Sequence, residues 1–507
     1  MLGTFIAVLD ATIVNVALPK IMASFGVGLD KIEWVITAYM LAMAVALPTS
    51  GWLADKFGYK RLYFIGLFLF TLGSMLCGRS SDENMLIFFR VIQGLGAGTI
   101  QPLGMAIVSR EFPPQQRGVA LGFWGIAAAA SVSFGPLIGG FLIDRFNWAL
   151  IFDVNVPIGI IAMLFTIIIQ REYKNKKTRQ FDLVGFISVT IFLPLSLYAL
   201  SQGNAETNSD GWHATYILIC AAISLIALVI FITTELTVKE PLLDLRLLMN
   251  RNFGISNIIL VIFSLGMFGS TFLLPVYLQN SLNYTALQAG AVFLPVGIIQ
   301  GVTAPLSGKI TDKISPKLPL VVGVILFAFS FYMNSKLSWL TERPYIMVAL
   351  YLRGLAMGLM FTALTTVSLL EIPREKMAQA SAITNSIRQL GGSLGVALLA
   401  TLLTSRIGYY NQLYGGAIRP GSETYQQTIN KIGHYMQYEA GSAPSEAKSN
   451  GQVLLLSNLY KQTYIQGIND DFLIAGIITL IGGIPIIFLN TKKTRIQNLP
   501  SDEYTIE

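Results

Sequence analysis

Charged side chains inside long apolar stretches are the residues of this chain best suited to chemistry. Asp10 lies in the run Leu9–Pro19, in the first apolar stretch. A helix rising about 1.5 Å per residue would carry Asp10 about 14 Å into a bilayer, close to its midplane. A carboxylate costs about 2.5–3.5 kcal/mol at that depth, and low polarity favours its protonated form. We therefore expect Asp10 to handle a proton or a cation; the alternative is a structural acid capped by Thr12, Asn15 or a neighbouring arginine.

Arg90 begins the motif Arg90–Gly98 inside another apolar stretch. A guanidinium in such a place needs a carboxylate or a substrate as its partner. Gln93 follows one helical turn later on the same face, and Gly94, Gly96 and Gly98 allow close helix contact. We expect Arg90 and Gln93 to take part in coupling protons to a substrate; the alternative is a structural ion pair.

The remaining acids are fewer and lie nearer to the outer side. Asp153, beside Asn155, is either a second proton or substrate site or an acid at the outer rim. Glu33 is a further candidate for coupling. Arg388 is a second deep arginine, in a half of the chain whose predicted spans hold no Asp or Glu. Acid chemistry must therefore come from the N-terminal half, with Asp10 first.

The sequence contains no residue pattern typical of a metal site, a catalytic triad or a nucleotide-binding site. We find no His or Cys cluster for a metal, no Ser/His/Asp arrangement and no nucleotide-binding loop. His213 and His434 fall in loops, and Cys77 and Cys220 fall in apolar runs, where reduced thiols are expected. We expect no enzymatic activity, no metal and no cofactor.

Composition points to lipid as the main solvent. Of 507 residues, 53% are hydrophobic and 12% are charged, and the mean hydropathy is +0.60. Soluble domains carry about a quarter charged residues. The net charge of +7 comes from basic residues in alternate loops, so we exclude nucleic acid as a partner.

Fourteen stretches are long enough to cross a bilayer as helices. They predict an all-α polytopic membrane protein. The predicted spans are Leu2–Leu18, Trp34–Leu53, Leu62–Cys77, Met85–Val108, Gly118–Ile143, Trp148–Ile169, Leu183–Leu200, Ala214–Thr233, Phe253–Leu278, Leu287–Ser307, Leu318–Met333, Tyr345–Leu370, Ala378–Leu403 and Phe472–Leu489.

The basic residues test this arrangement. Loops after even-numbered spans, with the C-terminal tail, hold 21 Lys and Arg, against 6 in the short loops after odd-numbered spans. The positive-inside rule then places the even loops and both termini in the cytoplasm. No cleavable signal peptide is recognisable, and no basic arm precedes the first span, so we expect the natural reading frame to begin upstream.

A charged turn occurs twice. Gly51, Asp55, Lys56 and Lys60 align without a gap with Gly308, Asp312, Lys313 and Lys317. Two halves with the same landmarks indicate an internal duplication. We expect a conformational latch between the halves; the alternative is charge that only sets topology. The predicted latch residues are Gly51, Asp55, Lys56, Gly58, Lys60, Arg61, Arg117, Asp312 and Lys313.

The duplication predicts the domain division. Residues 1–170 form one six-helix bundle and residues 253–490 the other, with a basic linker and two inserted helices in 171–252 and a cytoplasmic tail in 491–507. The polar segment 405–471 falls on the outer side, where Thr424–Met436 and Val453–Gly467 are candidate surface helices.

One further motif combines glycine with proline. It comprises Gly135, Pro136, Gly139 and Gly140 in the fifth span. Proline removes a helix hydrogen bond and glycine permits close packing. The motif is either a hinge or seal between the halves or an ordinary packing kink.

Several of these motifs, in this order, resemble the major facilitator superfamily. Gly51–Arg61 resembles its signature loop, and Leu9–Pro19, Trp148–Gly159 and Ala380–Ala397 are similar to its fourteen-span drug:proton antiporter branch of the EmrB/QacA type. The segment Asn469–Asp471 and the long outer loop look most like the EmrB subgroup.

The resemblance implies roles for particular residues. Asp10 would be the acid of the first helix, Arg90 the proton-relay arginine, and Gly135 with Pro136 the antiporter motif. Tyr59 and Asp153 depart from the family pattern. In the EmrB subgroup the permease works with a periplasmic adaptor and an outer-membrane channel, which makes these implied partners.

We therefore expect a proton-coupled multidrug exporter in the cell inner membrane. It would export lipophilic, drug-like compounds by alternating access, through a pocket lined by Phe, Tyr, Trp and Met. The alternative is an exporter of one endogenous solute, such as a lipid, siderophore or peptide. Rivals from other classes are an uptake symporter and a receptor or assembly factor with vestigial transport machinery.

Overall fold

The computed structural model describes residues 1–27, 29–113, 116–174, 181–203, 208, 210–417, 423–438 and 443–490. These residues form helices and connecting loops, with no strand among them. The all-α class is confirmed. The predicted tail 491–507 and most of the basic linker lie outside the described residues.

Seventeen α-helices and four short 3₁₀ helices make up the described chain. The α-helices are α1 (Leu2–Phe25), α2 (Leu29–Phe57), α3 (Tyr59–Cys77), α4 (Glu83–Glu111), α5 (Arg117–Arg145), α6 (Leu150–Asp153), α7 (Asn155–Ile169), α8 (Leu183–Gln202), α9 (Thr215–Thr237), α10 (Arg251–Asn280), α11 (Ala286–Ala291), α12 (Leu294–Lys313), α13 (Lys317–Asn334), α14 (Arg343–Leu370), α15 (Met377–Ala417), α16 (Glu423–Tyr438) and α17 (Pro444–Gly483). The 3₁₀ helices are η1 (Gly211–His213), η2 (Leu245–Met249), η3 (Arg374–Lys376) and η4 (Ile484–Phe488).

Each predicted span falls on a helix or on a pair of consecutive helices. Twelve helical stretches of the described residues are long and apolar enough to cross a membrane, and α1 and α5 cover the other two predicted spans. Two predicted spans are interrupted: the sixth is divided into α6 and α7 at Val154, and the tenth into α11 and α12 around Val292.

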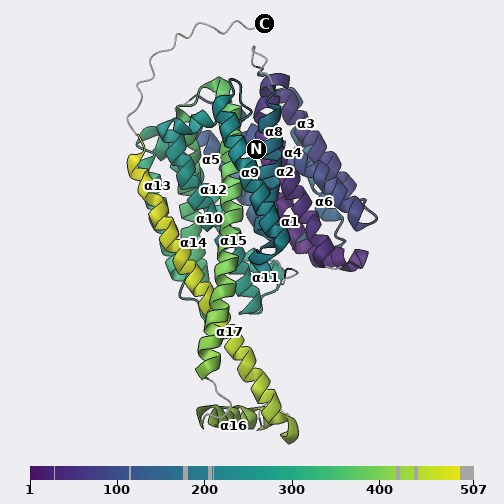
Figure 1. The fold of residues 1–507 in the computed structure, drawn as a ribbon, viewed down its shortest axis with the longest axis vertical. Helices are drawn as coiled ribbons and strands as arrows, with labels where there is room; N and C mark the ends of the chain where they lie inside the picture. The colour runs from purple at the N-terminus through teal and green to yellow at the C-terminus, as the bar shows by residue number, and fades with distance from the viewer. Residues whose placement is uncertain are drawn as a thin grey trace.

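The helices pack into two groups that touch along one interface (Figure 1). In the first group α4 packs on α2 and α3, and α5 packs on α1; in the second, α10 packs on α15, and α14 on α12 and α13. The groups meet where α5 contacts α12 and α14, and where α15 contacts α2 and α4. The antiparallel pair α8 and α9 lies outside both groups, with α8 against α2 and α15.

A helical arm extends beyond one end of this body (Figure 1). It consists of the distal parts of α15 and α17, which have 41 and 40 residues, and of α16, which packs across α17. The predicted surface helix Thr424–Met436 lies within α16, whereas Val453–Gly467 is an internal part of α17. Most of the segment predicted as an outer loop is therefore continuous with the spanning helices.

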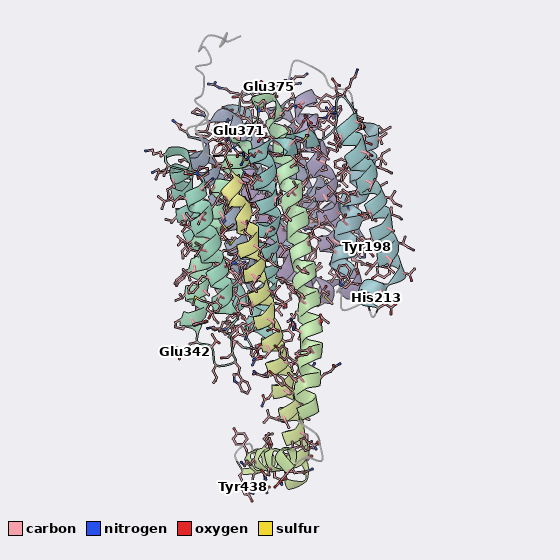
Figure 2. The ribbon with its side chains drawn as sticks, turned by 60° about the vertical axis from the view of Figure 1, so that its left-hand side comes forward. Tyr198, His213, Glu342, Glu371, Glu375 and Tyr438 are labelled. Carbon is pink, nitrogen blue, oxygen red and sulfur yellow. The ribbon has the colours of Figure 1, made fainter. Side chains whose placement is uncertain are left out.

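The two ends of the body are distinguished by labelled residues in Figure 2. Glu371 and Glu375 lie at one end, which also carries the loops rich in Lys and Arg; we call it the basic end. His213 and Glu342 lie at the opposite end, from which the arm extends with Tyr438 at its tip. We call this the arm end.

Candidate functional site

The carboxylate of Asp10 on α1 is the centre of a buried hydrogen-bonded group. Asp10 is 0% exposed and forms an ion pair with Nη1 of Arg90 on α4. Nε2 of Gln93 donates to Oδ1 of Asp10 at 2.8 Å, and Nδ2 of Asn155 on α7 donates to the same oxygen at 3.0 Å. We call Asp10, Arg90, Gln93 and Asn155 the acid site.

Arg90 is held in position by groups other than Asp10. Its Nε donates to the carbonyl oxygen of Val35 at 2.9 Å, and its Nη1 donates to Oε1 of Gln93 at 2.8 Å. The guanidinium also stacks over the ring of Tyr39, 4.0 Å from the centroid. Arg90 is therefore oriented by Val35, Gln93 and Tyr39 as well as by Asp10.

Asn155 is oriented by a residue that the sequence did not single out. Its Nδ2 also donates to Oγ of Ser74 at 3.1 Å, and Ser74 in turn donates to the carbonyl oxygen of Phe152 at 2.8 Å. Ser74 and Tyr39 lie within apolar runs and carry no charge, so only their spacing on the faces of α3 and α2 could have suggested a role.

Glycines bring the helices around the acid site into close contact. A Cβ on Gly94 or Gly98 would lie 2.5 Å from the carbonyl oxygen of Tyr39 or Met43, so α4 can approach α2 only because these residues are glycines. Gly135 and Gly139 of α5 face α1 in the same way. The Gly/Pro motif thus supports the helix that carries Asp10; the side chain of Pro136 lies outside those described.

The other predicted acid lies apart from this site. Asp153 ends α6 and pairs with Arg79 at 3.3 Å, and its side chain is 35% exposed. Of the two alternatives for Asp153, a second proton or substrate site or an acid at the outer rim, this position is more consistent with the second. The side chains of Glu33 and Asn15 lie outside the described ones.

Arg117 and Asp312, two of the predicted latch residues, form hydrogen bonds with the opposite helix group at the basic end. Nη1 of Arg117 on α5 donates to the carbonyl oxygen of Leu369 on α14 at 3.0 Å. The carboxylate of Asp312 on α12 accepts hydrogen bonds from the backbone N–H groups of Gly118 and Val119 in the first turn of α5. The positive end of the α5 dipole favours an acid there.

The motif around Gly51 makes different contacts. Gly51 lies against Gln379 of α15, and the turn continues through Gly58 at φ +98°. Lys60 donates from Nζ to the carbonyl oxygen of Ile167 at 2.7 Å and from its backbone to Glu172 at 3.1 Å, both in the first half of the chain.

The remaining latch residues also lie at the basic end. Arg61 is 3.9 Å from Glu172, and Lys56 lies over the ring of Trp52. Asp55 is buried, and Lys313 is exposed.

A group of polar, aromatic and sulfur-containing side chains joins the two helix groups in the middle of the body. Nη2 of Arg388 on α15 donates to Oε1 of Gln101 on α4 at 3.0 Å and to Oδ1 of Asn385 at 2.8 Å. The guanidinium lies 5.6 Å from the ring centroid of Phe361 on α14. Phe361 stacks on Trp124 of α5, with centroids 5.9 Å apart.

We call this group the interface cluster; it consists of Gln101, Met105, Trp124, Phe361, Asn385 and Arg388. The sequence singled out Arg388 alone. Gln101 and Asn385 are its other polar members, and the partners of its aromatic residues cannot be read from one chain.

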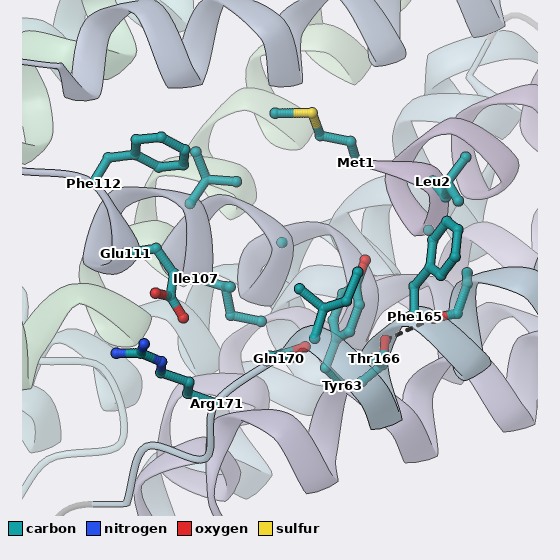
Figure 3. Close-up of a pocket in the computed structure, with 15 residues that line it drawn as sticks. Met1, Leu2, Tyr63, Ile107, Glu111, Phe112, Phe165, Thr166, Gln170 and Arg171 are labelled. Atoms are coloured by element: carbon teal, nitrogen blue, oxygen red, sulfur yellow. Dashed lines mark hydrogen bonds between the residues drawn. The ribbon is translucent and has the colours of Figure 1, made fainter. Parts of the chain in front are cut away.

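The cavities lie beside these groups. A cavity of about 740 Å³ is lined from α1, α3, α4 and α7 near the basic end (Figure 3). Figure 3 shows Glu111 and Arg171 side by side at one margin. No residue of the acid site or the interface cluster lines it. A second cavity, about 320 Å³, lies between α2, α8, α10 and α15 and so is lined from both helix groups and from α8.

Comparison with known proteins decides the family. The sequence model of the Major Facilitator Superfamily matches residues 1–396. The chain belongs to the major facilitator superfamily. As a member of this transporter family with many apolar helices, it is a multi-pass membrane protein.

Relatives with known names are similar over most of their length. The multidrug export protein EmrB of Haemophilus influenzae is 34% identical over 85% of both chains. The fatty acid resistance protein FarB of Neisseria gonorrhoeae is 32% identical over 96% of this chain and 94% of FarB. Among solved structures, the human organic anion transporter MFSD10 shares the fold, with a TM-score of 0.61, 14% identity and coverage of 96% of this chain and 97% of that one.

Proposed function

We propose that this protein is a proton-coupled efflux transporter that exports lipophilic compounds by alternating access. The observation that carries the proposal is the acid site: a fully buried carboxylate, Asp10, whose partners Arg90, Gln93 and Asn155 are all placed to respond to its charge. The names of the relatives EmrB and FarB, which refer to multidrug export and to fatty acid resistance, support export as the direction.

In this mechanism Asp10 exchanges a proton as the halves move. The three donors around Asp10 stabilise its ionised form in the arrangement described. Protonation would cancel the charge that pairs with Arg90, and an unpaired buried guanidinium costs about 3–5 kcal/mol. Arg90 would then favour a conformation in which another group or water meets it, which links proton uptake to the position of α1 and α4.

The contacts at the basic end fit one state of this cycle. Arg117 and Asp312 tie α5 to α14 and α12, and the close approach of Gly118 to Gly308 leaves no space between these helices. Release of substrate at the arm end requires this end to be closed. Because Asp312 binds the backbone of α5, the latch depends on a helix terminus as well as on ion pairs.

We also infer the placement in the cell. The excess of Lys and Arg at the basic end supports a cytoplasmic position for that end and for both termini. The arm would then project on the opposite side of the inner membrane. Its length and polarity support contact with a periplasmic adaptor, which would connect the transporter to an outer-membrane channel.

The driving force is sufficient for this task. A membrane potential of about 150 mV supplies about 3.5 kcal/mol per proton, which sustains a roughly 300-fold gradient at one proton per molecule exported. No cofactor is needed in this scheme.

The experiment that tests the proposal is drug-evoked proton release from acidified proteoliposomes. We expect Asp10→Asn to abolish the flux, whereas Asp153→Asn, which removes a partly exposed carboxylate outside the acid site, keeps it within about twofold. Size-exclusion profiles would show that both variants are folded. Flux that survives Asp10→Asn would move the proton site elsewhere, and flux with only one solute class would favour the single-solute exporter.

A further inference from the structure

Charged residues inside the membrane are unevenly balanced. The fourteen predicted spans contain five charged side chains: Asp10, Arg90, Asp153, Arg353 and Arg388. Asp10 pairs with Arg90, and Asp153 pairs with Arg79 outside the spans. Two arginines of the C-terminal half therefore remain without a carboxylate among the described residues.

The two arginines differ in their positions. Arg353 on α14 is 2% exposed and donates to α10 of its own helix group, to the carbonyl oxygen of Met267 at 3.1 Å and to Oγ1 of Thr271 at 2.5 Å. Arg388 reaches Gln101 in the opposite helix group and is only partly buried. Arg388 thus lies where a bound molecule would meet both halves.

The partners of Arg388 do not neutralise it. Within the described chain they are two amide oxygens and the face of Phe361. Both hydrogen bonds from Arg388 to these amide oxygens come from Nη2. A guanidinium has five N–H donors on three nitrogens. A guanidinium with donors to spare in an apolar setting has a strong affinity for a carboxylate or sulfonate, because such a group offers both the missing charge and the acceptors.

We propose that Arg388 binds the anionic group of the transported molecules, and that the substrates are lipophilic organic anions. The proposal rests on the export function proposed above and names its substrate class. Gln101 and Asn385 hold the guanidinium between the halves, and an incoming anion takes the donors on Nε and Nη1.

The apolar body of such a molecule has a place beside this group. The cavity of about 320 Å³ lies one helical turn from this group, toward the arm end. On α2 it is lined by Met40, one turn from Met43, which contacts Gln101. On α15 it is lined by Gly392, one turn from Arg388. Phe268 and Phe272 of α10 form another wall. This volume is at the lower end of the range for small-molecule sites, and its apolar lining suits a hydrocarbon or aromatic body.

The positive charge of Arg388 would make the site favour anionic over cationic ligands. A lipophilic cation in this position would face an unpaired guanidinium in a medium of low polarity, where like charges repel strongly. A neutral molecule would avoid that repulsion but would gain no ionic contact. The expected order of affinity is therefore anion, neutral molecule, cation.

The test compares two ligands that differ in one anionic group: 8-anilinonaphthalene-1-sulfonate and its parent N-phenyl-1-naphthylamine. Binding is measured by fluorescence titration of the full chain in nanodiscs of zwitterionic lipid, with empty nanodiscs subtracted. We expect wild type to prefer the sulfonate by about tenfold. Arg388→Gln should remove this preference without weakening the neutral ligand, and Arg388→Lys should keep most of it.

Arg353→Gln is the matched control, because it removes an equal charge from the same half of the protein at a position away from the interface. It should leave the preference within about twofold. Tetraphenylphosphonium, a lipophilic cation, should bind more tightly to Arg388→Gln than to wild type. Thermal unfolding of each variant in nanodiscs shows whether it is folded.

Three results would overturn the inference: no preference in wild type, a preference kept in folded Arg388→Gln, or equal losses in Arg388→Gln and Arg353→Gln. Equal losses would mean that the sulfonate preference comes from the overall positive charge of this half and not from a binding site at Arg388. These outcomes are distinguishable from failure of the proposed function. Drug-evoked proton flux with neutral or cationic drugs, without the sulfonate preference, would refute the substrate class alone; a sulfonate preference without any proton flux would refute the coupled export.

Discussion

Three side chains donate hydrogen bonds to the carboxylate of Asp10. Asn155 contributes one of them from α7, at 3.0 Å, and is fixed by Ser74. Asn155→Ala removes a donor that stabilises the ionised carboxylate, and a hydrogen bond to a charged group contributes about 1.5–3 kcal/mol. Without this donor the carboxylate is held less firmly between α1, α4 and α7, so we expect drug-evoked proton flux to fall about tenfold. The measurement is the initial rate of that flux in acidified proteoliposomes at a fixed pH.

A matched variant on the same helix provides the control. Thr166 is also buried on α7, and its hydroxyl bonds only to Ala162 one turn earlier among the described residues. Thr166→Ala should keep the flux within about twofold of wild type. Equal losses in both variants would show that the flux responds to the packing of α7 and not to the donor on Asp10.

Three residues of the acid site were singled out from the sequence, and the residues that orient them were not. Asp10, Arg90 and Gln93 stood out because charge is costly inside an apolar stretch. Ser74 and Tyr39, which orient Asn155 and Arg90, are uncharged residues in apolar runs, so nothing in the sequence distinguished them from their neighbours. Arg388 was predicted as a deep arginine, but its contacts with Gln101 and Phe361 join helices far apart in the sequence and required the structure.

At the scale of elements, α5 packs closely on α12 at the basic end. A Cβ on Gly118 would lie 2.6 Å from Oδ1 of Asp312 and 2.9 Å from the carbonyl oxygen of Gly308. Overpacking of this kind costs about 1–3 kcal/mol. We expect Gly118→Ala to lower the ratio of closed to open molecules at this end about tenfold. Distances between spin labels at Gln116 and Lys313 would report the change.

Gly125 provides the control for this substitution. It lies on the same helix, and a Cβ there would meet Phe361 at 3.6 Å, an ordinary van der Waals distance. Gly125→Ala should leave the label distances and the transport rate within about twofold of wild type. If Gly118→Ala gave the same closed distances as Gly125→Ala, the helix contact would not control closure.

The helices themselves were well predicted, and their lengths were less so. Each stretch that hydropathy singled out falls on a described helix or pair of helices, because lipid imposes a minimum apolar length. Hydropathy could not show that α1 continues to Phe25, or that the polar sequence after Leu403 remains helical to Ala417. Once a helix leaves the membrane, its limits depend on packing against a neighbour, here α17 against α15.

In the whole molecule, the inserted pair α8 and α9 links parts that alternating access would separate. Trp34 of α2 stacks on Tyr198 of α8 with ring centroids 5.8 Å apart, and Nε1 of Trp212 donates to Oγ1 of Thr401 on α15 at 2.9 Å. The pair is thus attached to both helix groups. The division into two six-helix bundles with an insertion stays a prediction, and so does the relative motion of the bundles.

The arm gives the last prediction at this scale. α15 has 41 residues and is about 60 Å long, twice the hydrocarbon thickness of about 30 Å, so its tip and α16 stand roughly 30 Å outside the membrane. Near its base, Asn469 of α17 bonds both backbone groups of Leu337 after α13, and Asp470 of α17 pairs with Arg406 of α15. Removing residues 424–436 should therefore leave the acid site and the interface cluster intact.

We expect this deletion to separate transport from assembly. In proteoliposomes, drug-evoked proton flux should stay within about twofold of wild type, because α16 packs on α17 in the arm, away from the acid site and the interface cluster. In cells, an adaptor that binds the arm should no longer be recovered with the transporter, and resistance should fall. Loss of flux in proteoliposomes would show that the arm acts on the transport cycle itself, and full recovery of the adaptor would place its contact elsewhere on the molecule.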